Sequence, residues 1–338
     1  MHIQEHVPLS QFTTLKVGGA ARYLAVVTSV EEVEQVRQFA QQIAAPVLVL
    51  GHGSNVLVSD EGFAGVVLVN AVKGVVSTPQ TDGSVLVQVG AGEDFDQFIE
   101  HTIKQGWWGL ENLSHIPGTV GATPIQNVGA YGVEVSSLIE SVEACSLTSG
   151  EHKTFSAGEC QFGYRESFFK TAAGRDWVVT QVTYRLRTNA APVLDYRDLQ
   201  TLAAAADKVP TQQEIRDEVI RIRSAKFPDW RTVGTAGSFF KNPIITAQQS
   251  KELLVQYPDL PTYPQPDGAV KVSLGWILDH VCHLRGYCQD DVCLSPHQAL
   301  VLINTGESAQ SVTDFAQHVA TVVYEKTGIT IEPEVRFV

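Results

Sequence analysis

The sequence predicts an α+β protein that is built from more than one region. Short apolar runs with strand character recur along the chain, and segments with helical spacing lie between them. The length of 338 residues suggests about two or three domains. A composition of 44% hydrophobic and 18% charged residues is typical of a chain that forms a buried core.

The first region, residues 1–74, combines several short strands with one helix. Ser29 and Glu32 have the spacing of a capping box, which predicts a helix from this point to Ala45. Val33, Val36 and Phe39 fall on one face of that helix. The predicted strands of this region are residues 22–27, 46–50, 56–58 and 66–69.

Two glycines lie in the segment Gly51-His-Gly-Ser-Asn55, between two of these strands. A dinucleotide fingerprint needs a strand, Gly-x-Gly-x-x-Gly and then a helix, whereas a strand follows here and the third glycine is missing. We therefore reject a Rossmann fold. A tight loop with outward backbone N–H groups, together with Ser54 and Asn55, would suit a diphosphate, although an ordinary hairpin turn also explains these residues.

The second region, residues 75–212, is mostly strand, with one helix. Residues 85–90, 141–147 and 176–186 read as strands, and the last of them alternates as a half-buried strand should. Residues 94–104 read as a helix.

A glycine-rich loop from Ile116 to Gly132 is the most informative segment of this region. It contains Gly118, Thr119, Gly121, Gln126, Asn127, Gly129 and Gly132. Glycine allows positive φ and close approach to a ligand, and loops of this kind present several N–H groups to an anion. The loop lacks Gly-Lys-Ser/Thr and is not a nucleoside triphosphate P-loop. A plain connector is the alternative.

The third region, residues 213–329, returns to helices. Residues 213–223, 272–284 and 311–327 have helical character, and Gly328 is expected to end the last helix. Residues 299–303 read as a buried strand. Residues 330–338 are strand-like, and we expect them to pack back onto the first region.

Charge and hydropathy limit the partners of the protein. A net charge of −13 argues against nucleic acid as the main partner, because phosphate contacts need clustered Lys and Arg. No apolar run reaches the roughly 18 residues that span a bilayer. Residues 1–8 lack the basic and then apolar order of a signal peptide. These features predict a cytoplasmic protein with no membrane partner.

The five cysteines show no regular pattern, which argues against a disulfide framework. Cys282, Cys288 and Cys293 lie in a Cys/His-rich run, residues 280–297. Zinc sites usually show paired cysteines with a matching second half, and that spacing is absent here. The run therefore predicts buried or exposed thiols and no metal site.

Five motifs together resemble one known family. They are Gly51-His-Gly-Ser-Asn55, the Ile116–Gly132 loop, Tyr164-Arg-Glu-Ser167, Gly237-Ser-Phe-Phe-Lys-Asn-Pro243 and Glu332-Pro-Glu-Val-Arg336. In this order they resemble UDP-N-acetylenolpyruvoylglucosamine reductase, in its longer, type I branch. The resemblance extends from Phe12 to Arg336, and five ordered motifs are far more specific than any one of them.

The resemblance implies an FAD-binding fold of the vanillyl-alcohol-oxidase type over the first two regions and a separate α+β substrate domain in the third. It implies an oxidoreductase of peptidoglycan synthesis with non-covalent FAD. NADPH would reduce the FAD, and the enolpyruvyl group of UDP-N-acetylglucosamine enolpyruvate would then be reduced at the same site, in ping-pong order. A monomer is expected.

The same resemblance assigns three catalytic residues. Arg165 would stabilise the enolate-like charge that develops beside the substrate carboxylate, because a guanidinium binds a carboxylate bidentately. Ser238 would give a proton to C2 of the substrate. Glu334 matches the family's catalytic glutamate better than Glu332 does, because it directly precedes Val-Arg. Without the resemblance, an ion pair of Arg165 with Glu166, a turn serine and a strand-edge carboxylate are the simpler explanations of these residues.

Further residues are implied as ligand contacts. The FAD contacts would be Gly51, Gly53, Ser54, Asn55, Gly118, Thr119, Gly121, Ala122, Gln126, Asn127, Gly129 and Arg336. The substrate contacts would be Tyr131, Tyr196, Lys226 and Asn242, with Tyr196 on a loop that closes over the UDP-sugar. Surface exposure is the alternative for Tyr196 and Lys226.

Some positions depart from the family. His52 stands where Gly or Glu is expected, and a covalent flavin link through this histidine is an alternative to an exposed loop histidine. Thr123 stands where Ala is usual, and residues 288–291 lack the usual glycines. The functional rivals are another oxidase of the same flavin superfamily, which would lack the motifs of Ser238 and Glu334, and a catalytically dead nucleotide-sugar-binding protein, which would have lost Arg165, Ser238 or Glu334.

Overall fold

The computed structural model describes residues 1–205 and 209–338, which form two compact units. The first unit comprises Met1–Val7, Ala21–His52 and Ala64–Arg223. The second comprises Pro8–Ala20, Gly53–Phe63 and Ser224–Val338. Both units are therefore discontinuous in sequence. The division of the sequence into 1–74, 75–212 and 213–329 stays a prediction.

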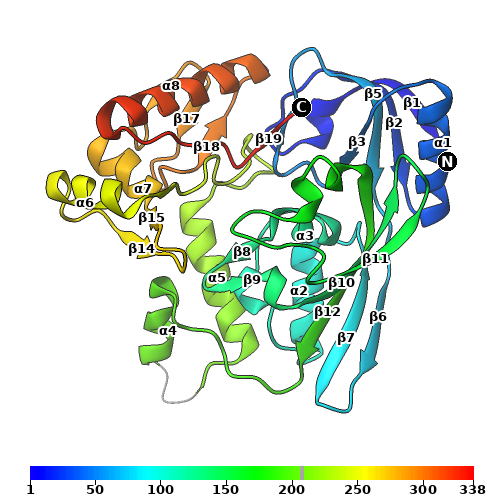
Figure 1. Cartoon of the computed structure of the whole chain (residues 1–338), viewed down its shortest axis with the longest axis horizontal. Helices are drawn as coiled ribbons and strands as arrows, with labels where there is room; N and C mark the ends of the chain where they lie inside the picture. The colour runs from blue at the N-terminus through cyan, green and yellow to red at the C-terminus, as the bar shows by residue number, and fades with distance from the viewer. Residues whose placement is uncertain (206–208) are drawn as a thin grey trace. The chain divides into compact units, whose positions relative to one another are not determined.

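A four-stranded sheet and one helix begin the first unit (Figure 1, blue). In sheet order the strands are β1 (Ile3–Pro8), β2 (Ala20–Val27), β5 (Phe63–Asn70) and β3 (Val47–Leu50). Helix α1 (Val30–Gln42) buries Val33, Val36 and Ala40 in one cluster with residues of β2 and β5. Ser29 Oγ accepts the N–H of Glu32 at the start of α1, as predicted. The second half of the predicted capping box is wrong, because Glu32 accepts from the N–H of Thr28.

A five-stranded antiparallel sheet forms most of the rest of the first unit (Figure 1, cyan and green). In sheet order the strands are β11 (His152–Ser156), β10 (Ile139–Ser146), β12 (Trp177–Arg187), β7 (Ser84–Gly90) and β6 (Val75–Pro79). Helix α2 (Phe95–Lys104) begins after Asp94, whose carboxylate accepts the N–H of Gln97. Phe95, Phe98 and Ile99 of α2 are buried in the same core as the inner strands.

Shorter elements complete the first unit. They are α3 (Thr123–Gln126), β8 (Gly129–Ala130), β9 (Val133–Glu134), α4 (Gln200–Ala205) and α5 (Gln212–Lys226), of which α5 extends past Arg223 into the second unit. Ile215, Val219 and Ile222 of α5 pack in one cluster with Tyr131 and Leu199. The β8–β9 hairpin therefore lies beside α5 (Figure 1).

The second unit contains three small sheets and three α-helices. One sheet has the order β13 (Ile244–Ile245), β15 (Val270–Val272), β14 (Thr262–Pro264), and another β16 (Cys288–Gln289), β17 (Val292–Leu294), β18 (Leu302–Asn304). The third pairs β4 (Val56–Leu57) in parallel with the C-terminal strand β19 (Arg336–Phe337). The α-helices are α6 (Ala247–Gln256), α7 (Leu274–Trp276) and α8 (Ala309–Thr327).

Helix α8 has a defined cap at each end. At its start the Asp60 carboxylate accepts the N–H groups of Ala309 at 2.7 Å and Gln310 at 3.1 Å. Its end is Gly328, with a left-handed φ of 68°, as predicted. Val312, Phe315 and Val319 on its inner face belong to the core of the second unit. No helix among the described residues is both long and apolar enough to span a membrane.

Two predicted elements of the second unit have different bounds in the structure. The predicted helix 272–284 is the three-residue α7 followed by a π-helix over Ile277–Val281. The N–H of Cys282 donates to the carbonyl of Ile277, five residues earlier, at 2.9 Å, which widens the helical turn. Ile277, Leu278 and Val281 of this turn are nevertheless buried at a spacing that an α-helix would also have. The predicted strand 299–303 begins only at Leu302.

The prediction of free thiols is wrong for two cysteines. Cys288 and Cys293 are opposite each other in the β16–β17 hairpin and form a disulfide. Asp290, with φ of 52°, takes a left-handed conformation in that hairpin without glycine. Cys145 and Cys160 are buried thiols, and burial raises the pKa of Cys160 to about 12. Over the described ranges, no three His, Cys, Asp or Glu side chains gather as a metal site.

Candidate active site

Tyr131 and Gly132 form the turn of the β8–β9 hairpin in the first unit. Their φ angles are 49° and 86°, and two positive φ values in a two-residue hairpin turn are typical of type I′. A tyrosine with positive φ is uncommon, so the backbone conformation that positions the Tyr131 ring is energetically unfavourable. The side chain is only 7% exposed. Burial raises the pKa of the Tyr131 hydroxyl, and the positive charge of Arg223 opposes this shift.

Arg165 lies at a second tight turn, between Gly163 and Glu166, which exchange two backbone hydrogen bonds. Its φ of 56° is also left-handed, and such outliers are frequent at functional sites. The Nη2 of Arg165 donates to the carbonyl of Gly129 at 2.7 Å. Glu166 forms an ion pair of 3.4 Å with Lys170. The structure therefore brings Arg165 to the hairpin that carries Tyr131.

Tyr196 joins this group from a distant segment of the chain. It directly precedes a 3₁₀ helix, Arg197–Leu199, and its side chain is 44% exposed. The centroids of the Tyr196 and Tyr131 rings are 5.3 Å apart at an interplanar angle of 81°, an edge-to-face contact. Three of the predicted site residues, Arg165, Tyr131 and Tyr196, are thus neighbours of one hairpin.

The two glycine-rich loops approach each other closely at Gly51, within the first unit. A Cβ at Gly51 would lie 2.4 Å from Oγ1 of Thr119. A Cβ at Gly121 would lie 2.6 Å from the Cβ of Ala91, and the Gly121 N–H donates to the Ala91 carbonyl at 2.8 Å. These glycines therefore allow backbone segments to pack without a side chain between them.

Asn127 shapes the second loop. It ends α3 with a left-handed φ of 41°, and its Nδ2 donates to the carboxylate of Glu134 and the carbonyl of Gly163. Its Oδ1 accepts the N–H of Ser136. The amide of Asn127 is thus engaged within the fold. The other predicted contacts of this loop are Gly118 at φ of 139°, Ala122 at the end of a 3₁₀ helix, Gln126 at the end of α3 and Gly129 in β8.

His52 is half-buried, and its Nδ1 lies 3.7 Å from the carboxylate of Asp94 at the start of α2. Burial lowers the pKa of His52, whereas the charge of Asp94 opposes the shift. Covalent attachment of a flavin at this residue stays an untested alternative. Thr123, the other departure in these loops, is buried and shares a hydrogen bond of 2.6 Å with the hydroxyl of Tyr184.

The remaining loop residues belong to the second unit. Gly53 has φ of 61°, and a Cβ there would lie 1.9 Å from the carbonyl oxygen of Phe12. Asn55 Nδ2 donates to the carbonyl of Glu334 at 3.2 Å. The N–H of Arg336 donates to the carbonyl of Asn55 at 3.0 Å. The loop is therefore fixed directly to the segment that carries the predicted catalytic glutamate.

Ser238 and Glu334 lie on neighbouring extended segments. The N–H of Glu334 donates to the carbonyl of Phe239 at 2.8 Å, and the N–H of Phe239 donates to Leu300 at 2.8 Å. Ser238 itself forms a β-bridge with Val301. Both Ser238 and Glu334 are half-buried. By contrast, the side chain of Glu332 is 74% exposed and pairs with Lys241 at 3.7 Å.

The other predicted residues of the second unit lie near these segments in sequence or at element ends. Asn242 Oδ1 accepts the N–H of Leu274 at the start of α7, at 3.0 Å. Lys226 is the half-buried last residue of α5. Ser54 is half-buried in the first loop, and Arg336 is exposed in β19.

Two residues near the tyrosines were not predicted. Arg223 donates from Nε to the carbonyl of His115 at 3.0 Å and also bonds the Tyr131 hydroxyl, and burial lowers its pKa. Arg223 lies three residues before Lys226, in a segment where two arginines precede the lysine. This cluster of basic residues could have indicated it. Asn112 binds the backbone of the Tyr131 turn, and nothing in its local sequence indicates this.

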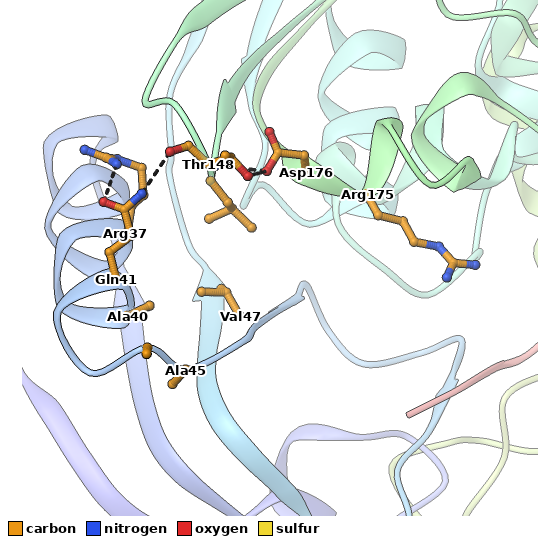
Figure 2. Close-up of a pocket in the computed structure, with 10 residues that line it drawn as sticks. Arg37, Ala40, Gln41, Ala45, Val47, Thr148, Arg175 and Asp176 are labelled. Carbon is orange, nitrogen blue, oxygen red and sulfur yellow. Dashed lines mark hydrogen bonds between the residues drawn. The ribbon is translucent and has the colours of Figure 1, made fainter.

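The pocket in Figure 2 is separate from these residues. It has a volume of about 390 Å³ and lies in the first unit, between α1 and the turns at Thr148 and Asp176. Its polar side chains already bind one another: Gln41 donates to the carbonyl of Thr148, and Asp176 accepts from the Thr148 hydroxyl. It contains none of the predicted site residues.

Each unit therefore presents a distinct set of chemical groups. The first offers a guanidinium and two tyrosines beside a glycine-rich loop, which suits an anionic ligand with a planar or sugar part. The second offers a serine hydroxyl and a carboxyl group on adjacent segments, which suits proton transfer and hydrogen bonding to a polar substrate.

Comparison with protein families gives two matches. An FAD binding domain matches residues 21–156. The C-terminal domain of UDP-N-acetylenolpyruvoylglucosamine reductase matches residues 229–338. The first match contains both glycine-rich loops, and the second contains the segments of Ser238 and Glu334.

Curated relatives and a solved structure agree with these matches. The UDP-N-acetylenolpyruvoylglucosamine reductase of Porphyromonas gingivalis is 39% identical over 341 residues, which cover 100% of both chains. That of Pectobacterium atrosepticum is 40% identical and covers 98% of this chain and 95% of its own. The crystal structure of the Thermus caldophilus enzyme aligns with a TM-score of 0.68 at 26% identity, over 100% of this chain and 99% of that one.

Proposed function

The chain belongs to the UDP-N-acetylenolpyruvoylglucosamine reductase family, and from this premise we propose how its residues divide the reaction among them. The protein is an FAD-dependent oxidoreductase of peptidoglycan synthesis. It uses NADPH to reduce the enolpyruvyl group of UDP-N-acetylglucosamine enolpyruvate, a small-molecule substrate, to UDP-N-acetylmuramate.

The glycine-rich loops fit FAD. The absence of a side chain at Gly51 lets its loop approach Thr119 closely, and the left-handed Gly53 is buried where its loop packs against the carbonyl of Phe12. We assign the FAD contacts to these two loops and to Arg336. Gly121 and Asn127 would act mainly by shaping the second loop, because their polar groups are engaged by residues outside it, Ala91 for Gly121 and Glu134 for Asn127. When bound, FAD supplies the hydride that reaches C3 of the enolpyruvyl group.

Arg165 and Glu334 are proposed to stabilise the charge that then develops on the substrate. Hydride addition at C3 leaves negative charge at C2, which spreads into the adjacent carboxylate. A fixed guanidinium and a hydrogen-bond donor directed at that carboxylate favour the enolate-like state over the starting olefin. Arg165 is held by the Gly129 carbonyl at 2.7 Å, and the backbone of Glu334 is held by Phe239, so each is anchored within its own unit.

Ser238 is proposed to deliver the proton to C2. A serine hydroxyl is a weak acid, but a carbanion-like C2 is a strong base, and exclusion of water makes the transfer productive. The backbone of the serine is fixed by its bridge to Val301. The proton that leaves the hydroxyl is replaced from solvent after the product departs.

Tyr131, Tyr196, Lys226 and Asn242 are proposed to bind the UDP-sugar. The contact between the rings of Tyr131 and Tyr196 provides an aromatic surface together with two hydroxyl groups. Lys226 would neutralise diphosphate charge. Asn242 holds the start of α7 through Oδ1, which leaves its Nδ2 as the donor for substrate.

One observation carries this proposal most directly: the backbone bond from Glu334 to Phe239 places the glutamate segment against the serine segment. The function is tested by the visible spectrum of the purified protein under anaerobic conditions. Addition of NADPH should bleach the flavin, and UDP-N-acetylglucosamine enolpyruvate should restore it. A flavin that bleaches and does not return with this substrate would contradict the proposed reaction.

We also propose that the enzyme works as a cytoplasmic monomer. Every residue assigned above comes from one chain, so no second copy is needed to complete the set. Light scattering during gel filtration should give the mass of a single chain, 36.8 kDa. A mass of twice this value at micromolar concentration would contradict the monomer.

A further inference from the structure

Asn112 connects two segments that each carry a tyrosine. It lies in a short 3₁₀ helix, Glu111–Leu113, and its side chain is fully buried. Its Nδ2 donates to the carbonyl of Tyr131 at 2.9 Å and to the carbonyl of Val193 at 2.8 Å. Tyr131 is in the β8–β9 turn, and Val193 lies three residues before Tyr196.

A side-chain amide suits both bonds at once. The two partners are carbonyl oxygens, so the atom between them must be the nitrogen with its two N–H groups. An aspartate would direct an acceptor at both carbonyls, and a leucine would leave both without a donor. The Oδ1 of Asn112 is buried and has no hydrogen-bond partner among the described residues. Burial of this oxygen without a hydrogen bond costs free energy, which the two bonds donated by Nδ2 must offset.

The segment from Val193 to Leu199 is attached on both sides of Tyr196, because Leu194 and Leu199 both pack in the cluster with α5. The side chains of Val193 and Tyr196 are 37% and 44% exposed, whereas Leu199 is fully buried in the cluster with α5. A Cβ at Gly132 would lie 3.5 Å from Cγ1 of Val193 and 4.0 Å from the Cβ of Tyr196, so the segment runs along the hairpin turn. Asn112 is thus one of several contacts that hold this segment, and it joins the segment to the turn of Tyr131.

We propose that Asn112 is a positioning residue that keeps the segments of Tyr131 and Tyr196 together when the Tyr196 loop closes over the UDP-sugar. This inference rests on the proposed function, in which both tyrosines bind substrate. Two bonds from one buried amide favour this arrangement, which reduces the ordering that the substrate must impose on an exposed segment. Loss of the amide should therefore weaken substrate binding without a direct effect on hydride or proton transfer.

The test is substrate affinity, measured by titration of the oxidised flavoprotein with UDP-N-acetylglucosamine enolpyruvate while flavin absorbance is followed. The variants are Asn112→Leu and, where that variant folds poorly, Asn112→Asp, which preserves volume. Each should raise the substrate Kd about tenfold. The rate of flavin reduction at saturating NADPH should stay unchanged.

Asn70→Leu is the matched control. Asn70 is also a buried asparagine of the first unit, and it donates to the carbonyl of Val179 at 2.7 Å, away from both tyrosines. It should lower the melting temperature as Asn112→Leu does, and leave the substrate Kd unchanged. An equal rise in Kd in both variants would mean that Asn112 has a merely structural role, and would overturn the inference.

A double-mutant cycle with Tyr196→Ala separates positioning from independent binding. The two substitutions should be strongly non-additive, because Asn112 acts through the segment that carries Tyr196. Additive losses in affinity would overturn the inference. If wild-type protein binds the substrate and Asn112→Leu binds it equally well, the inference fails alone. If wild-type protein does not bind it at all, the proposed function fails together with the inference.

Discussion

The side-chain amide of Asn55 donates a hydrogen bond of 3.2 Å to the backbone carbonyl of Glu334, 279 positions further along the chain. The N–H of Arg336 returns a bond of 3.0 Å to the carbonyl of Asn55. On the other side, the N–H of Glu334 is bound by Phe239. The backbone of the predicted catalytic glutamate is therefore fixed from both directions, by a glycine-rich loop and by the segment of the predicted proton donor.

Asn55→Asp should disturb Glu334 without touching its side chain. The new carboxylate would face the Glu334 carbonyl and offer no donor, which loses a hydrogen bond and adds repulsion. We expect reoxidation of reduced flavin by substrate to slow about tenfold, whereas reduction by NADPH, normalised to bound FAD, should change little. Asn70→Asp is the control. Equal slowing of both half-reactions would argue against a specific effect on Glu334.

Gly51→Ala should reduce FAD retention. Its Cβ would lie 2.4 Å from Oγ1 of Thr119, so one of the two glycine-rich loops must move. The measurement is the ratio of flavin to protein absorbance after gel filtration. The clash is with a side chain, so it should be smaller in a Thr119→Ala background. Adding Gly51→Ala to Thr119→Ala should therefore cost less FAD than adding Gly51→Ala to the wild-type protein. Full FAD content in Gly51→Ala would show that the loops do not need this approach.

Asp96 should make stability depend on pH. Arg216 binds its carboxylate at 2.6 and 3.0 Å, and the His115 N–H binds it at 2.5 Å. Burial alone would raise the pKa of Asp96, but the hydrogen bonds from Arg216 and His115 outweigh it and lower the pKa. The stabilisation is therefore complete above the unfolded pKa of about 3.9 and is lost as pH falls through the lower folded value.

Asp96→Asn should accordingly lower the free energy of unfolding by about 3 kcal/mol at pH 7, because it leaves the largely buried Arg216 without its charge partner. Urea unfolding of both proteins at pH 7 and at pH 3 measures this. The difference between them should shrink at pH 3. A difference that is the same at both pH values would mean that the charge of Asp96 contributes nothing.

The disulfide gives a simple chemical prediction. Thiol titration of the denatured, non-reduced protein should find three groups, Cys145, Cys160 and Cys282, and all five cysteines after reduction. Five reactive thiols before reduction would instead agree with the irregular cysteine spacing of the sequence. Five reactive thiols before reduction would also agree with the cytoplasmic proposal, because stable disulfides are uncommon in that compartment.

Features with a local cause could be predicted from the sequence. Ser29 begins α1 and Gly328 ends α8 as expected, because capping depends on residues only a few positions apart. The inner strands β2, β3, β5, β7, β10 and β12 and helix α2 were also predicted near their observed bounds, since their apolar spacing is regular, whereas the edge strands β1, β6 and β11 were not predicted. The ordered motifs gave the family, which the comparisons confirm.

Features that depend on distant partners could not be predicted. The bond between Asn55 and Glu334 and the two bonds of Asn112 join segments whose proximity is set only by the complete fold. The disulfide required the register of the β16–β17 hairpin, and the π-helix after α7 has the same apolar spacing as an α-helix. The left-handed Tyr131 and Arg165 are exceptions to local preference, as functional turns often are.

Ser238→Ala tests whether Ser238 gives the proton to C2 of the substrate. Ser311→Ala, at an exposed serine of α8, is the control. Anaerobic stopped-flow absorbance would follow flavin reduction by NADPH and then reoxidation by UDP-N-acetylglucosamine enolpyruvate. We predict wild-type reduction and reoxidation slowed about 10²- to 10⁴-fold in Ser238→Ala. Reoxidation at the wild-type rate in that variant would contradict the account.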